Sequence, residues 1–92
     1  MDQDQTRNLI FEKADKFISL ANELTLEDNS GTVGTALRYA AARYSAFEAS
    51  IQAGDLEQER EDQLKVFSDE FARMLRINID EYIQVQKSQK PV

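Results

Sequence analysis

The sequence predicts an all-α protein, an antiparallel three-helix bundle with a long C-terminal helix. Three stretches repeat apolar residues every three or four positions, the 92 residues include only 3 Gly and 1 Pro, and short polar segments separate the stretches. We expect a single helical domain over 1–92, with helices at about 6–26, 32–53 and 55–88 and frayed ends. A helical hairpin that completes its core by dimerisation is the alternative.

The first helix is predicted from one narrow apolar face. At 100° per residue, spacings of three and four bring these residues to the same side: Ile10, Ala14, Phe17, Ala21 and Leu24. Residues 1–5 are polar and are expected to fray. Residues 27–31 then read as a turn, after which Ser30 or Thr32 is expected to cap the next helix by accepting a hydrogen bond from a free N–H group.

The stretch 33–51 is expected to be the most buried element, because it is rich in alanine and carries only three charged residues in a chain that is 30% charged. Its predicted core face comprises Val33, Leu37, Ala40, Tyr44, Phe47 and Ile51. Gly54 is placed to end this helix in a left-handed conformation, and Asp55 to cap the third helix. Such a short connection favours antiparallel neighbours.

The third helix is predicted to be the longest. Residues 55–88 contain no Gly or Pro, and Pro91 is expected to mark the end. At 1.5 Å per residue it would span roughly 50 Å, against roughly 30 Å for the first helix. Either it is interrupted near 57–62, or one end projects from the bundle. Its apolar stripe is Leu56, Leu64, Phe67, Phe71, Met74, Leu75, Asn78 and Tyr82.

A second face of the middle helix is a candidate interaction surface. Ala42, Ala46, Ala49 and Ala53 share the side opposite the apolar stripe, with Tyr39 nearby, and Arg43 is also a candidate contact residue. Small residues permit close helix approach, so we expect a protein partner or a second copy there; the alternative is that alanine is simply a good helix former facing solvent. Three isoleucines off the main stripe of the third helix would also need cover: Ile77, Ile79 and Ile83.

Two polar residues are expected to be buried. Asn78 falls at the centre of the third helix's stripe, where a buried amide must find a partner or cost about 1–3 kcal/mol. We expect a hydrogen bond that fixes helix register, to a tyrosine hydroxyl such as that of Tyr44; a ligand contact or exposure at the bundle end are the alternatives. Arg43 flanks the core stripe and is the candidate residue for an anion site.

Composition disfavours several classes of function. The net charge of -6 argues against nucleic acid and anionic membrane surfaces as partners. Without His or Cys, the chain lacks zinc-finger ligands and the residues of Ser–His–Asp or Cys–His catalysis. The acidic cluster at the start of the third helix is a solvated, dipole-favoured turn rather than a metal site. We expect no cofactor, no metal and a cytoplasmic location.

Four segments of the chain resemble a known protein family. The most specific is 36–47 (ALRYAAARYSAF), and the others are 11–18 (FEKADKFI), 74–75 (ML) and 80–83 (DEYI). On these motifs the chain resembles a family of short proteobacterial proteins catalogued as a domain of unknown function, number 3144. The resemblance implies a small bacterial helical protein and brings no catalytic residues with it.

The function expected from the residues is contact with an unknown protein partner or a second copy, without catalysis. The alternative is a small molecule or anion bound between helices, near Arg43 and Tyr44, with Tyr39 and Asn78 also lining the pocket. An enzyme using carboxylates from two helices is the third possibility, and it would need those acids to converge on one pocket.

Overall fold

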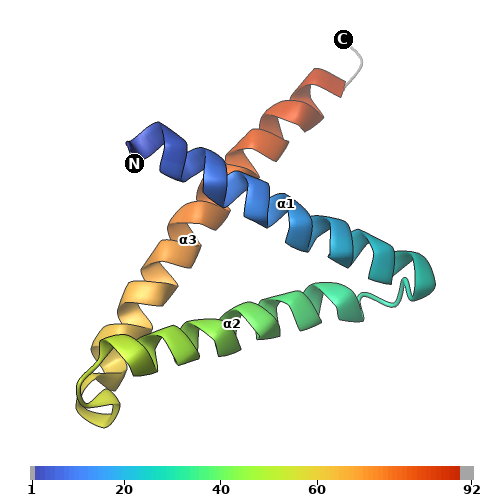
Figure 1. The fold of residues 1–92 in the computed structure, drawn as a ribbon. Coiled ribbons are helices and arrows are strands. Elements are labelled where there is room, and N and C mark those ends of the chain that lie inside the picture. Colours follow the sequence, from blue (N-terminus) through green and yellow to red (C-terminus); the bar gives the residue numbers. More distant parts are fainter. Residues whose placement is uncertain (1, 90–92) are drawn as a thin grey trace. The chain divides into compact units, whose positions relative to one another are not determined.

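The computed structural model describes residues 2–89, which form three α-helices and no strand (Figure 1). They are α1 (Gln3–Glu27), α2 (Thr32–Gln52) and α3 (Leu56–Gln89). The predicted all-α class is confirmed, and so is the long C-terminal helix. With 34 residues, α3 is about 51 Å long and continues without a break through 57–62. Pro91, expected to mark its end, lies outside the described residues.

The chain divides into two compact units, Met1–Tyr44 and Ser45–Val92. The first unit contains α1 and the first part of α2. The second contains the last part of α2 and all of α3. The boundary therefore falls inside α2, and each unit is a pair of helical segments joined by a short turn.

The start of α1 is three residues earlier than the sequence predicted, because Asp2 caps it. Oδ1 of Asp2 accepts a hydrogen bond from the Gln5 amide at 2.8 Å, and Oε1 of Gln5 accepts one from the Asp2 amide at 3.4 Å. This reciprocal pair is a capping box, which satisfies two N–H groups that the first turn leaves unpaired. The expected fraying of 1–5 was wrong for the described residues from Asp2 onward.

The turn between α1 and α2 is built on Asp28. Its amide donates to the Leu24 carbonyl at 3.0 Å and closes α1, and its Oδ1 accepts from the Ser30 amide at 2.9 Å. Gly31 follows with φ +94°, a left-handed conformation that side-chain-bearing residues rarely adopt. Oγ of Ser30 then accepts from the Thr32 amide at 3.4 Å, so Ser30 supports the start of α2 as predicted.

The turn between α2 and α3 spans residues 53–55. Oδ1 of Asp55 accepts from the Gln58 amide at 3.2 Å, as expected of the residue that caps α3. The prediction for Gly54 was wrong: Gly31 is the residue with positive φ among those described, and Gly54 is not left-handed. The Ala53 amide already bonds to the Ala49 carbonyl at 2.9 Å, which finishes α2 without a left-handed residue.

The stretch 33–51, expected to be the most buried element, contains the buried residue of the described helices but is far from enclosed. Within residues 2–89 only Ala49 is buried, at 5% exposed, and most of α2 faces solvent. The three helices thus satisfy their backbone hydrogen bonds locally and leave most large apolar side chains accessible. This result changes which face of α2 is available for contacts.

Candidate interaction surface

The contact between helices in the second unit uses the small side chains of α2. Ser45 and Ala49 of α2, with Ala53 directly after its end, are spaced four apart and are less exposed than their neighbours, and Ala49 is the most covered. Across the turn, three α3 residues with the same spacing are partly buried: Glu59, Gln63 and Phe67. One row of covered residues thus lies before the turn and one lies after it, and both have the i, i+4 spacing of a helix ridge. We infer that these two ridges pack against each other in the hairpin.

This packing explains why the contact is short. Helices whose i, i+4 ridges interdigitate cross at about 50°, so their axes diverge within a few turns. Small side chains let the backbones approach at the crossing, whereas large side chains farther along α3 gain no cover from the last turns of α2. The large residues on the opposite side of α2 keep a large part of their area exposed.

The predicted partner surface on α2 is therefore only partly available. Ala49 was expected to face a partner, but it is buried, because the hairpin with α3 occupies its side of the helix. Tyr39, Ala42, Arg43 and Ala46 are exposed. The row that includes Ser45 was missed, and its signal was the i, i+4 spacing of small residues directly before a short turn.

The predicted core face of α2 is exposed in its place. Leu37, Tyr44, Phe47 and Ile51 all stand in solvent over a large part of their area. Tyr44, expected to be a buried polar residue, is 64% exposed, because the hairpin uses the small side chains rather than this stripe. The covered residues of the hairpin thus lie on the small-residue side of α2 and not on the stripe that was expected to form the core.

Asn78 is likewise exposed, and the expected burial of its amide was wrong. Its Nδ2 donates to the Met74 carbonyl at 2.8 Å, one turn back in the same helix. Asn78 lies eleven residues beyond Phe67, the last partly buried residue of α3. It is therefore past the reach of the short hairpin contact, and a local backbone acceptor serves its amide.

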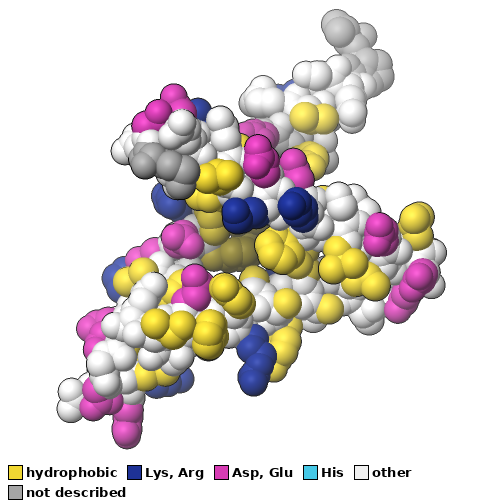
Figure 2. Space-filling view, in the orientation of Figure 1, with side chains coloured by type: hydrophobic (Ala, Val, Ile, Leu, Met, Phe, Trp, Pro, Cys, Tyr) yellow, Lys and Arg dark blue, Asp and Glu magenta, His cyan; other side chains and the backbone are white. Residues whose placement is uncertain are grey.

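The apolar face predicted on α1 exists as a face, and it is largely uncovered. Ile10, Phe17 and Leu24 are exposed, Phe17 at 63%, while Ala14 and Ala21 between them are partly buried. Figure 2 shows hydrophobic side chains at the surface on the face that it displays. Contiguous apolar surface of this kind marks interaction sites in proteins.

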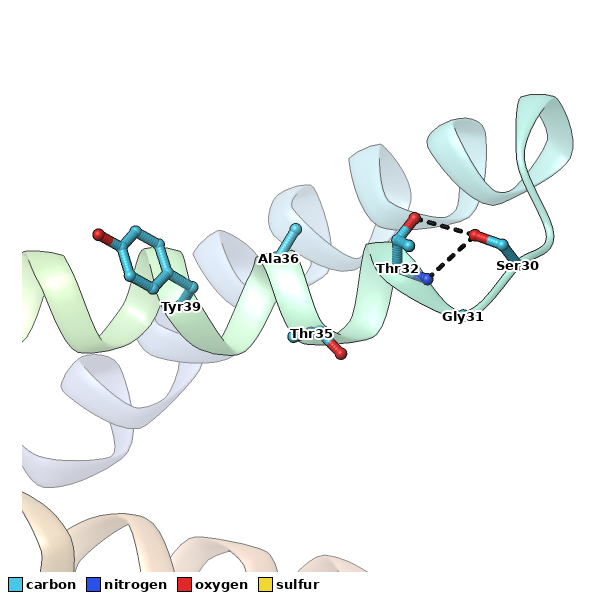
Figure 3. A pocket seen from close by; sticks show the side chains of 6 residues that line it. All are labelled: Ser30, Gly31, Thr32, Thr35, Ala36 and Tyr39. Atoms are coloured by element: carbon cyan, nitrogen blue, oxygen red, sulfur yellow. Dashed lines mark hydrogen bonds between the residues drawn. The ribbon is translucent and has the colours of Figure 1, made fainter.

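A hollow of about 590 Å³ opens beside the turn that precedes α2 (Figure 3). Its lining comes entirely from the turn and the first two turns of the helix: Ser30, Gly31, Thr32, Thr35, Ala36 and Tyr39. Oγ of Ser30 donates to Oγ1 of Thr32 at 3.1 Å, so these hydroxyls bind each other. Tyr39 is the residue of the predicted binding set that lines this hollow, whereas Arg43, Tyr44 and Asn78 do not.

Asp28 anchors the turn electrostatically. Hydrogen bonding with the Ser30 side chain lowers the pKa of Asp28 most, followed by the Ser30 amide and the Thr32 hydroxyl, whose Oγ1 donates to Oδ2 at 3.2 Å. The charged form is thus the one that the turn favours. Asp28 was not singled out from the sequence; an Asp two residues before Ser in a Gly-containing turn is the signal that could have found it.

Charged groups elsewhere do not converge. Arg43, the candidate residue for an anion site, forms no ion pair within residues 2–89. In the same part of the chain, no group of three or more acidic side chains is arranged to hold a metal ion. Nor does any helix over those residues have both the length and the apolar character needed to cross a membrane.

The comparisons with known proteins decide the family. The profile of a family described as "Protein of unknown function (DUF3144)" matches residues 10–83, four fifths of the chain. The chain belongs to this family. The resemblance carried by residues 36–47 is thus confirmed as membership. Comparisons with curated proteins and with solved structures find no match.

The matched region of this DUF3144 chain contains most of the features described above, and it excludes the Asp2 cap and the two ends of the helical chain. Both turns, the Ala49 contact row and the hollow beside Gly31 lie inside residues 10–83. Asn78 lies inside it too, whereas Val85 and the last turn of α3 lie beyond it. The family's description adds no catalytic or binding role to these residues.

Proposed function

We propose that this protein is a non-enzymatic bacterial module of the cytoplasm that binds another protein through the apolar face of α1. The exposure of that face carries the proposal. Ile10, Phe17 and Leu24 recur at helical spacing, and each leaves about half of its area in solvent. An amphipathic helix of this pattern docks its apolar side into a groove on a partner, anchored by residues at i, i+3, i+4 and i+7.

The free energy of burying this face favours association with a partner over exposure to solvent. Covering a large apolar side chain is worth about 1.5–3 kcal/mol, so the half-exposed anchors of α1 represent several kcal/mol of available binding free energy. The backbone of α1 is already helical and capped by Asp2, which lowers the ordering cost of association. A chain without Cys suits a reducing compartment, which supports the cytoplasmic location. The lack of His supports a role without acid–base catalysis near neutral pH.

The test is affinity capture from a native cell lysate with matched variants. Phe17→Glu places a carboxylate in the apolar face, and Ser19→Glu adds the same charge about 200° around the helix, on its polar side. We expect a protein partner to bind the wild type and the Ser19→Glu variant, and to be lost from Phe17→Glu. Capture that is identical for all three proteins, or the absence of any partner other than this chain, would contradict the proposal.

A further inference from the structure

The C-terminal half of α3 carries a second exposed apolar face, centred on Asn78. Five large side chains share this side of the helix with Asn78 and are 42–69% exposed. At 100° per residue they fall within about 60° of it. We name this surface the Asn78 face; it comprises Phe71, Met74, Leu75, Asn78, Tyr82 and Val85.

The Asn78 face is nearly symmetric along the sequence. Phe71 and Val85 stand seven residues before and after Asn78, and Met74 and Tyr82 stand four before and after it. A two-fold axis through the contact makes the same patch face itself, so a sequence that reads alike in both directions suits an antiparallel pair of identical helices. No charged residue lies within this set; Glu81, at its edge about 60° from Asn78, is the nearest.

We propose that a second copy of this chain packs antiparallel along the Asn78 face. Phe71 then lies opposite Val85 of the partner subunit, and Met74 lies opposite the partner's Tyr82. The two Asn78 amides meet on the axis. Each amide keeps an acceptor oxygen and one N–H beyond the bond to the Met74 carbonyl, so each can donate to the other and fix the register.

The size of the surface fits a second copy. Large side chains bury about 150–250 Å² each, so these exposed fractions leave on the order of 500 Å² per copy, and two copies reach about 1,000 Å², the lower limit for a specific interface. This inference rests on the proposed function, a module that acts through protein contacts, and it names the partner of one further face.

Charge selects the antiparallel direction. The first turns of α3 carry Glu57, Glu59, Glu61 and Asp62. A parallel pair would set two such acidic segments side by side, at a cost in repulsion. An antiparallel pair centred on Asn78 places them at opposite ends of the assembly, about 55 Å apart along the axis.

Sedimentation velocity of the full-length chain tests the surface. We expect the wild type to form a concentration-dependent dimer in the micromolar range. Leu75→Glu should weaken it at least about 100-fold, because the carboxylate meets apolar side chains and Glu81 of the partner subunit. Gln84→Glu adds the same charge off the Asn78 face and should leave the dimer within about threefold. A wild-type monomer at several hundred micromolar, or equal effects of the two variants, would overturn the proposal.

Disulfide trapping tests the direction, since the chain has no cysteine of its own. We expect a mixture of Phe71→Cys and Val85→Cys proteins to give a mixed disulfide dimer, and neither protein to link to itself. In the antiparallel pair two copies of position 71 are about 21 Å apart along the axis, and a disulfide requires Cα atoms within about 7 Å. Self-linking of each single variant would contradict the antiparallel pair. If the chain is monomeric but still captures a protein partner through Phe17, the dimer proposal is refuted and the proposed function stands.

Discussion

Ala49→Leu should destabilise the protein, and the structure sets the scale of the effect. Ala49 is 5% exposed where the small-residue row of α2 meets α3. Three added carbon atoms must either push the two helices apart or take a strained rotamer, which costs about 1–3 kcal/mol in packed contacts. For a chain of this size, each 1 kcal/mol lowers Tm by about 4–8 °C.

Ala46→Leu is the matched control, because Ala46 lies on the same helix but is exposed. Its effect should stay within about 0.5 kcal/mol. Urea unfolding followed by circular dichroism, at one fixed protein concentration, gives both values. If Ala49→Leu is as stable as the wild type, or if Ala46→Leu costs as much, Ala49 is not in the helix contact and the reasoning fails.

Three further predictions concern the turns. Asp55→Ala should cost about 1 kcal/mol in the same urea assay, because the Gln58 amide loses its capping acceptor; no loss would show that the cap is not needed. Gly31→Ala should cost roughly 1–2 kcal/mol, since φ of +94° disfavours a Cβ, and a neutral result would contradict that backbone conformation. The lowered pKa of Asp28 means that its contribution is complete above the ordinary value of 3.8 and is lost as pH falls through the lower, folded value. NMR titration of the Ser30 amide should therefore show a midpoint below 3.8, and a midpoint at or above it would refute the turn geometry.

Helix positions were predictable from sequence because they depend on local signals. The apolar spacing in 6–26 and 33–51, and the Asp55 cap, act within one or two turns of chain. The exception at the N-terminus is also local: Asp2 and Gln5 have the spacing of a capping box, but the next apolar residue along the chain is Leu9, so the helix face gives no sign of the earlier start.

The choice of buried face was not predictable in the same way. Hydrophobicity assigned the large stripe of α2 to the core, whereas the hairpin selected Ser45, Ala49 and Ala53 for their small size. How closely two helices approach depends on the side chains of both. The sequence of α2 therefore does not show that its partner on α3 is the row of Glu59, Gln63 and Phe67.

The central claim is that α2 turns its small side chains toward α3 and leaves its large apolar side chains in solvent. Labelling of single cysteines with a thiol reagent tests this most directly, since the chain has no other thiol. Ala49→Cys and Ile51→Cys lie two residues apart on nearly opposite sides of α2. We predict slow labelling of the Ala49→Cys protein and fast labelling of the Ile51→Cys protein; the reverse order would contradict the account.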